Sequence, residues 1–264
     1  MENSKILLER AIRSLDEGGV DGSSWVVGGG TVLASVYSHR TSKDIDIFIS
    51  DPQLLARISP RFNSVTEDAL DYNETNSFVS LTFFEGKIDF INASQISKFS
   101  PSRKNFLGYD VFVEDPVEIV SKKMFFRGKY ALPRDVFDLA VVYDSDRKKD
   151  LLETFSCLTD EVSAFERAFL CGIDSNGFVP YSLSNKDMLL PSNVMVDGRE
   201  VEVCRLFLTD LKSLNFSIED DKVVIDHSWA EERIRRHTAA FENRLKGIKD
   251  VGNDDDEGVG GGRK

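Results

Sequence analysis

A glycine turn followed by two acidic residues on one strand constrains this chain more than any other feature. Residues 26–31 read Val-Val-Gly-Gly-Gly-Thr, and residues 43–49 read Lys-Asp-Ile-Asp-Ile-Phe-Ile. Because strand side chains alternate between faces, Asp44 and Asp46 are expected to point the same way, where the two carboxylates repel unless a cation lies between them. Oxygen ligands suit Mg²⁺ or Mn²⁺, and a glycine turn at a helix N-terminus binds phosphate through its N–H groups. The pattern predicts a phosphate-binding turn beside a divalent metal site.

A third acidic residue occupies an apolar strand further along the chain. Asp89 lies within Lys87-Ile88-Asp89-Phe90-Ile91, and an acid in such a strand needs a partner. If this strand lies beside residues 45–49, Asp89 completes a three-carboxylate site for two metal ions about 3.5–4 Å apart, or serves as the general base. The alternative is a hairpin carboxylate that faces solvent beside Lys87. A phosphate-binding turn together with a metal site is the arrangement needed to transfer a nucleotide.

Hydrophobic periodicity predicts an α+β fold, a small mixed β-sheet with flanking helices. We expect helices over residues 4–15, 31–37, 116–127 and 134–143, a short helix beginning at Asp51-Pro52, and strands over 25–27, 45–49, 78–84, 87–91 and 109–113. We expect the catalytic domain to span residues 1–146. A mainly helical region over 147–250 follows, with helices over 150–170 and 228–248 and a candidate β-hairpin over 195–203. Residues 251–264 are expected to be a disordered acidic and glycine-rich tail.

Composition excludes several classes of function. The net charge of −12 argues against tight non-specific binding to duplex nucleic acid, which depends on many cationic contacts. Three cysteines and three histidines, all scattered, give poor support to zinc chemistry or a Ser-His-Asp triad. No apolar run reaches the length of a membrane span and the start is unlike a signal peptide, so we expect a cytoplasmic protein. His39 is expected on the surface or in a loop, and Lys122 in solvent.

The motifs, taken in order, resemble those of the DNA polymerase β-like nucleotidyltransferase superfamily, and most closely the AbiEii/AbiGii toxin-type nucleotidyltransferases. The first motif of that family is similar to Gly29-Gly30-Thr31-Val32-Leu33-Ala34 with Arg40-Thr41-Ser42-Lys43-Asp44-Ile45-Asp46. The second, a lysine with an arginine one helical turn later, is similar to Lys123-Met124-Phe125-Phe126-Arg127. The third is similar to Arg134-Asp135-Val136-Phe137-Asp138, so the resemblance covers about residues 26–140.

The resemblance implies a catalytic sheet followed by a helical part, and Mg²⁺-dependent transfer of a nucleotide from an NTP to an RNA or protein acceptor. Members are commonly toxins encoded beside an antitoxin, in toxin–antitoxin or phage-defence systems. RNA, with tRNA as the leading acceptor class, and a cognate antitoxin are therefore the expected partners. The third carboxylate varies in this family, so a purely structural Asp89 would still be compatible with activity.

Candidate roles for the later motifs follow from helix geometry within that resemblance. Lys123 and Arg127, four residues apart, share a helix face, and these two cations need anions opposite them. We expect Lys123 to bind the nucleotide phosphates with Arg127 as its helper, and Asp135 or Asp138 to orient these cations or to bind the sugar. The expected nucleotide-binding residues are Gly29, Gly30, Thr31, Arg40, Lys123, Arg127 and Arg134. The expected catalytic residues are Asp44, Asp46, Asp89, Lys123, Asp135 and Asp138.

Two other interpretations stay open from the sequence. The Arg134–Asp138 pair can be an ordinary intrahelical ion pair, and the lysine and arginine of the 116–127 helix can be a solvated face. In function, the alternative to an enzyme is a catalytically silent module with the same fold that binds a nucleotide or a partner protein. The complete acidic pair argues against a silent module, because such a domain has no need to keep two adjacent charges.

Overall fold

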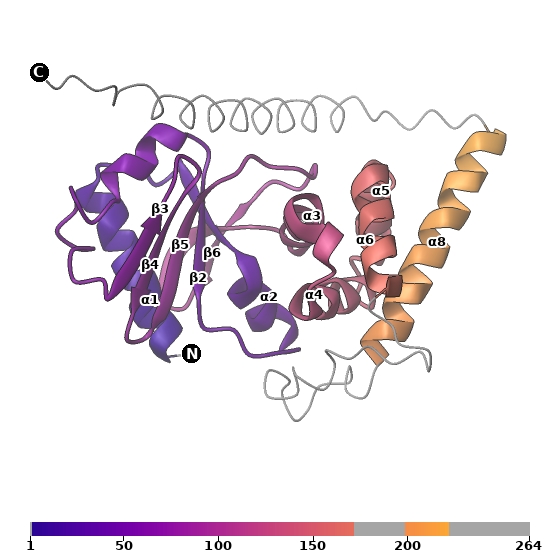
Figure 1. Ribbon diagram of the computed structural model, residues 1–264, viewed down its shortest axis with the longest axis horizontal. Coiled ribbons are helices and arrows are strands. Elements are labelled where there is room, and N and C mark those ends of the chain that lie inside the picture. Colours follow the sequence, from indigo (N-terminus) through magenta and orange to yellow (C-terminus); the bar gives the residue numbers. More distant parts are fainter. Residues whose placement is uncertain (1, 172–198, 222–264) are drawn as a thin grey trace, which may run out of the picture. The chain divides into compact units, whose positions relative to one another are not determined.

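The computed structural model describes residues 2–171 and 199–221, and within them a mixed seven-stranded sheet forms the centre of the N-terminal part (Figure 1). The strands are β1 (Trp25–Gly28), β2 (Ile45–Ile49), β3 (Asp71–Glu74), β4 (Phe78–Phe83), β5 (Gly86–Asn92), β6 (Ser102–Phe106) and β7 (Tyr109–Val113). Their order across the sheet is β3-β4-β5-β2-β1-β7-β6. Strand β2 runs parallel to β5 and β1 parallel to β7, whereas the other neighbours are antiparallel. The prediction of a mixed α+β sheet is confirmed.

One face of this sheet forms the core. Val27, Ile47, Phe90 and Val79 are register neighbours on β1, β2, β5 and β4, and each is at most 2% exposed. Burying a side chain of this kind stabilises the fold by roughly 1.5–3 kcal/mol. Helix α1 (Glu2–Glu17) packs against β2 and β5. Because side chains alternate along each strand, the next residue of each of these strands points to the opposite face.

The helices nearest the sheet begin where the sequence signals place them. Helix α2 (Gly29–Tyr37) follows the glycine turn, and η1 (Pro52–Arg57) begins after the Asp51 cap. Helix α3 (Pro116–Arg127) starts with proline in its first turn, and the Asp115 carboxylate accepts a hydrogen bond from Val117 N at 2.9 Å. A short η2 (Gly128–Tyr130) connects α3 to α4 (Pro133–Tyr143). The predicted bounds of α3 are confirmed.

The C-terminal helices depart from the sequence prediction in two places. The single helix expected over 150–170 is two helices, α5 (Lys148–Phe155) and α6 (Thr159–Cys171). The β-hairpin expected over 195–203 is wrong for residues 199–203, because these begin α8 (Arg199–Asp221). Helix α8 packs on α4 and α5 (Figure 1). Its residues Val201, Cys204 and Phe207 are buried at helical spacing.

Some expectations concern residues outside the described ranges. The helix expected over 228–248 and the tail over 251–264 both lie there. The division at residue 146 stays a prediction. Among the helices that are described, none combines the length and the apolar character that crossing a membrane requires.

Candidate active site

The glycine turn touches a carboxylate of the neighbouring strand. Gly29 has a φ of +74°, which disfavours any other residue, and a Cβ placed there would lie 1.8 Å from Asp46 Oδ2. A Cβ on Gly30 would lie 2.4 Å from an Arg40 guanidinium nitrogen. The backbone that begins α2 runs directly against the side chains of Asp46 and Arg40, so a larger residue at either position forces these side chains to move. The N-terminus of α2 therefore lies against Asp46.

A row of polar side chains crosses the sheet on the face opposite the core. Gly28 is the register neighbour of Asp46, and Asp46 is the register neighbour of Asp89. On the far side of Gly28, Glu114 N donates to Val27 O at 2.9 Å and so extends the β1–β7 pairing to Glu114. Residues in register project to the same face of a sheet. The expectation that residues 87–91 lie beside 45–49 is confirmed, and it places Asp89 next to Asp46.

Asp46 lies where its charged form is disfavoured. Its side chain is half-buried, and burial raises its pKa, with the nearby Asp89 carboxylate as the second cause. Lys123 and Arg127 act in the opposite direction without outweighing these two effects. A carboxylate that is desolvated and faces another carboxylate gains from a cation placed between them. A positive charge would therefore be favoured at the start of β2, beside the glycine turn.

The carboxylates of Asp44 and Asp89 both contact Lys87 in this structure. Asp44 precedes β2, is exposed, and accepts a hydrogen bond from Lys87 N at 3.2 Å. The Thr31 hydroxyl donates to the Asp44 carbonyl oxygen and thereby fixes the start of β2 against α2. The Asp89 carboxylate lies 3.0 Å from Lys87 Nζ.

The carboxylate oxygens beside the glycine turn suit a hard divalent cation, but they do not form one cluster. Within residues 2–171 and 199–221 no group of three or more His, Cys, Asp or Glu side chains is placed to hold a metal ion. The carboxylates of Asp44 and Asp46 have the chemistry that Mg²⁺ prefers. Asp89 as a third ligand stays a prediction, because its carboxylate is paired with Lys87 here.

The second and third sequence motifs meet across α3 and α4. Lys123 Nζ lies 2.8 Å from Asp138 Oδ2 and 3.0 Å from Asp135 Oδ1, and Arg127 Nε lies 2.7 Å from Asp135 Oδ2. Burial acts to raise the pKa of Asp135, but Lys123 and Arg127 outweigh it and lower that pKa. The same two cations act on Asp46. The solvated-face interpretation of Lys123 is wrong, since this side chain is 9% exposed.

Asp138 is the fully buried centre of this cluster. It accepts hydrogen bonds from Arg40 through two nitrogens at 2.8 Å, and its Oδ1 lies 2.5 Å from His39 Nε2. Burial acts to raise the pKa of Asp138, but Lys123 and then the hydrogen bonds hold it well below its usual value. The intrahelical pair expected with Arg134 is replaced by these partners, and Arg134 is exposed. His39, expected at the surface, is buried.

Two predicted nucleotide-binding residues, Arg40 and Thr31, have roles within the protein in this structure. Two Arg40 nitrogens bind Asp138, and a third donates to Thr41 O at 3.0 Å, so this guanidinium supports the backbone at Gly30. The Thr31 hydroxyl is engaged with Asp44. Contact of Arg40, Thr31 or Arg134 with a phosphate stays a prediction.

Sequence reasoning missed a buried glutamate–lysine pair beside the site. Glu114 is 2% exposed, and Lys122 Nζ contacts its Oε1 while lying 3.6 Å from Glu118 Oε1. Lys122 was expected in solvent, and that expectation is wrong because the two buried glutamates need its charge. Burial raises the pKa of Glu114 to about 7, and Lys122 opposes the shift. The spacing of Glu118 and Lys122, four residues apart on α3, is the one sequence signal that indicated such a pair.

Comparison with known proteins gives the family. The family model described as nucleotidyl transferase AbiEii toxin, type IV TA system, matches residues 15–169. None of the curated proteins matches the chain. MenT4, a nucleotidyltransferase toxin from Mycobacterium tuberculosis H37Rv, superposes with a TM-score of 0.51 at 16% identity, over 92% of this chain and 91% of that one.

Two further solved structures superpose on this chain with lower TM-scores. A protein from H. pylori, provisionally described as a nucleotidyltransferase, has a TM-score of 0.44 at 18% identity, over 80% of this chain and 96% of its own. An antigenic nucleotidyltransferase-like protein from Paracoccidioides brasiliensis has a TM-score of 0.32 at 12% identity, over 60% and 91%. The match to MenT4 shows a shared fold. Since the family model spans more than half of the 264 residues, and includes the glycine turn, the acidic strand and helices α3 and α4, this protein belongs to the AbiEii family of nucleotidyltransferase toxins.

Proposed function

We propose that this protein transfers a nucleotide from an NTP to an acceptor hydroxyl on RNA, with tRNA as the first acceptor to test. The proposal includes Mg²⁺ or Mn²⁺ as cofactor and a cognate antitoxin as partner. The observation that carries it is the contact between the glycine turn and Asp46, where a Cβ on Gly29 would lie 1.8 Å from the carboxylate. A triphosphate held by this turn would lie directly against the acidic pair.

In this proposal the triphosphate is bound from two sides, by the start of α2 and by cations of α3. Backbone N–H groups of Gly29 and Gly30 at the start of α2 would hold phosphate oxygens. Lys123 and Arg127, whose charges act on Asp46, would neutralise the triphosphate from α3. The cation would be held by Asp44 and Asp46, and when bound it would stabilise charge on the reacting phosphate and favour ionisation of the acceptor hydroxyl. Asp135 and Asp138 would act as positioning residues, because they contact the cations of the cluster.

The proposed chemical step is an in-line displacement at phosphorus. The acceptor oxygen forms a bond to the α-phosphorus, and the bond from that phosphorus to the oxygen bridging the β-phosphate breaks. Pyrophosphate leaves with the electron pair of the broken bond. Asp89, in register with Asp46, is the proposed base that takes the hydroxyl proton. The Asp89 carboxylate lies 3.0 Å from Lys87 Nζ in this structure.

The test is a labelling experiment. The protein is incubated with each of the four NTPs labelled at the α-phosphate, with Mg²⁺ and total RNA, and the products are separated on denaturing gels. We expect label in a tRNA-sized band with one or more NTPs. Label in protein instead would overturn the RNA acceptor, and label in neither fraction with any NTP would overturn the transfer activity.

A matched pair of variants ties the label to the site. Asp46→Asn removes the charge beside the glycine turn and is expected to abolish labelling. Asp110→Asn makes the same change in an exposed ion pair with Arg103, where the carboxylate is 64% exposed, and is expected to leave labelling unchanged. Equal labelling by the two variants would contradict the assignment of Asp46.

A further inference from the structure

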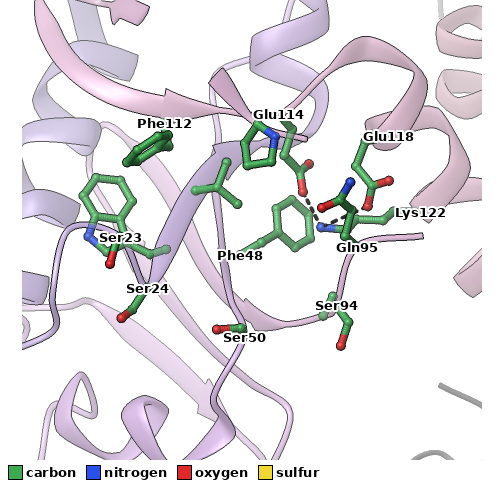
Figure 2. Close-up of a pocket in the computed structure, with 14 residues that line it drawn as sticks. Ser23, Ser24, Phe48, Ser50, Ser94, Gln95, Phe112, Glu114, Glu118 and Lys122 are labelled. Carbon is green, nitrogen blue, oxygen red and sulfur yellow. Dashed lines mark hydrogen bonds and ion pairs between the residues drawn. The ribbon is translucent and has the colours of Figure 1, made fainter. Parts of the chain in front are cut away.

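A pocket of about 280 Å³ is lined by Phe48 (Figure 2), which lies on the same face of the sheet as Asp46. Phe48 follows Asp46 by two residues on β2, so the pocket begins roughly 7 Å along the strand from the carboxylate. The Phe48 ring also reaches the glycine turn, because a Cβ on Gly28 would lie 2.7 Å from its Cε2. The pocket and the candidate active site therefore adjoin over Gly28.

The walls of the pocket combine aromatic rings with small hydroxyl groups. Phe48 and Phe112 line it together with Trp25, and the serines Ser24, Ser50 and Ser94 lie along another side (Figure 2). The Phe48 ring is a fixed wall, since Lys122 Nζ lies 4.0 Å from its centroid and is itself held by two glutamates. Flat apolar walls with a few polar groups are typical of sites that stack and hydrogen-bond a planar heterocycle.

One buried acceptor at the pocket has no hydrogen bond within the described part of the chain. Glu114 Oε1 contacts Lys122, but Oε2, which sits over Gly28, accepts none. Glu114 is 2% exposed, and a buried polar atom without a partner carries a desolvation cost. A ligand that donates an N–H to this oxygen would remove that cost.

The opposite wall is fixed by Glu118. Its carboxylate accepts hydrogen bonds from Ile96 N at 2.9 Å, Ser97 N at 2.6 Å and Ser97 Oγ at 2.7 Å. These bonds anchor the segment after β5 that supplies Ser94 and Gln95 to the pocket. The pocket is therefore formed by hydrogen-bonded elements on both sides and keeps its shape without a ligand.

We propose that this pocket binds one nucleobase of a substrate, stacked against Phe48 and donating an N–H to Glu114. This inference rests on the proposed transfer of a nucleotide and names where a substrate base lies. The volume suits one base with its sugar rather than a whole nucleoside triphosphate. Both substrates of the proposed reaction, the NTP and the RNA, carry bases that must come near Asp46, and base-aromatic stacking is a common way to hold them.

Binding can be tested without catalysis. Trp25 lines the pocket, and the chain has two tryptophans, so Trp229→Phe leaves Trp25 as the fluorophore. In this background we titrate adenosine, guanosine, cytidine and uridine without Mg²⁺, since free nucleosides carry no phosphate for the glycine turn. We expect saturable quenching with at least one nucleoside. Glu114→Gln should weaken that binding about tenfold, the effect of losing a hydrogen bond to a charged group.

A blocking variant and a matched control identify the source of the base. Ser94→Phe fills the mouth from an exposed position, whereas Ser102→Phe makes the same change at an exposed serine of β6 in register with Val113, on the face away from Phe112. We expect Ser94→Phe alone to abolish quenching and to raise one KM at least tenfold. A raised KM for the NTP places the NTP base in the pocket, and a raised KM for RNA places the acceptor base there.

The outcomes separate this inference from the proposed function. If no nucleoside quenches Trp25, and Ser94→Phe matches Ser102→Phe in both KM values, the pocket does not bind a base although transfer continues. If nucleosides bind and Ser94→Phe abolishes that binding while no NTP gives label, the pocket assignment holds and the transfer proposal fails.

Discussion

Replacing Gly29 by alanine tests the contact on which the candidate site depends. The added Cβ would lie 1.8 Å from Asp46 Oδ2 and 2.5 Å from its Cγ, whereas real Cβ contacts essentially never fall below 3.0 Å. The carboxylate must therefore move by at least 1.2 Å, the difference between 3.0 and 1.8 Å. Alanine at a φ of +74° costs about 1–2 kcal/mol, and overpacking adds about 1–3 kcal/mol. We expect a total loss of about 2–5 kcal/mol in the free energy of unfolding.

Urea denaturation followed by circular dichroism measures this loss, with Gly22→Ala as the matched control. A Cβ on Gly22 meets nothing within 4 Å, so that variant should stay within about 0.5 kcal/mol of the parent. Any folded Gly29→Ala protein should transfer nucleotide at least about a hundredfold more slowly, because the displaced carboxylate no longer has the reactive geometry. Stability equal to that of Gly22→Ala would refute the close approach.

The double variant Gly29→Ala/Asp46→Ala separates the two parts of the cost. It removes Oδ2 and Cγ, the two closest atoms, and leaves the Asp46 Cβ at 2.7 Å. We expect part of the overpacking cost to be recovered, while the backbone cost of about 1–2 kcal/mol stays. Strictly additive effects would show that the carboxylate does not lie against the turn.

The remaining predictions concern the buried charges. Lys123→Ala should lower transfer at least about a hundredfold in the labelling assay and leave the fold intact by circular dichroism, because Asp135 and Asp138 keep their arginine partners; normal turnover would refute its role. Asp138→Asn should cost about 3–5 kcal/mol in urea denaturation, since Lys123 and Arg40 lose a buried counter-charge, and a loss below 1 kcal/mol would contradict this. The raised pKa of Glu114, about 7 against 4.5 unfolded, means that the native state holds the proton more tightly. Its contribution to stability is present below pH 4.5 and falls by up to about 3 kcal/mol as the pH rises to 7. Glu114→Gln should lack that part of the decline, and an unchanged pH profile would contradict the shift.

Local patterns predicted the sheet centre because they are strong there. Residues 45–49 and 87–91 are mostly apolar, with a polar residue at intervals, as expected of buried strands. Pro116 after Asp115 marks a helix start, which the structure confirms. Strands β3 and β6 were missed, since Asp-Tyr-Asn-Glu and Ser-Arg-Lys-Asn-Phe are polar and largely exposed. Both lie at the edges of the sheet, where one neighbouring strand supplies the pairing and no apolar face is needed.

The site was predicted where its chemistry is local and missed where it is not. Asp46 follows from alternation along β2, whereas Asp44 precedes that strand. The partners of Asp138 are 98 and 99 residues away, at Arg40 and His39, and no spacing rule connects them. Glu114 likewise looks like an ordinary residue between a strand and a helix cap. Its place beside Gly28 depends on the parallel pairing of β1 and β7, which periodicity does not reveal.

The opposite shifts of two aspartates locate the chemistry within the site. Asp138 is the more deeply buried, yet Lys123, Arg40 and His39 surround it and hold its pKa well below the usual value. Asp46 is more exposed, but its pKa is raised, first by burial and then by the Asp89 carboxylate, and the cations of α3 compensate only in part. A cation would gain little at Asp138, where the charge is already balanced, and more at Asp46. Under the proposed function, Asp138 positions the cluster, and the divalent ion and the phosphates it accompanies would bind beside Asp46 at the start of β2.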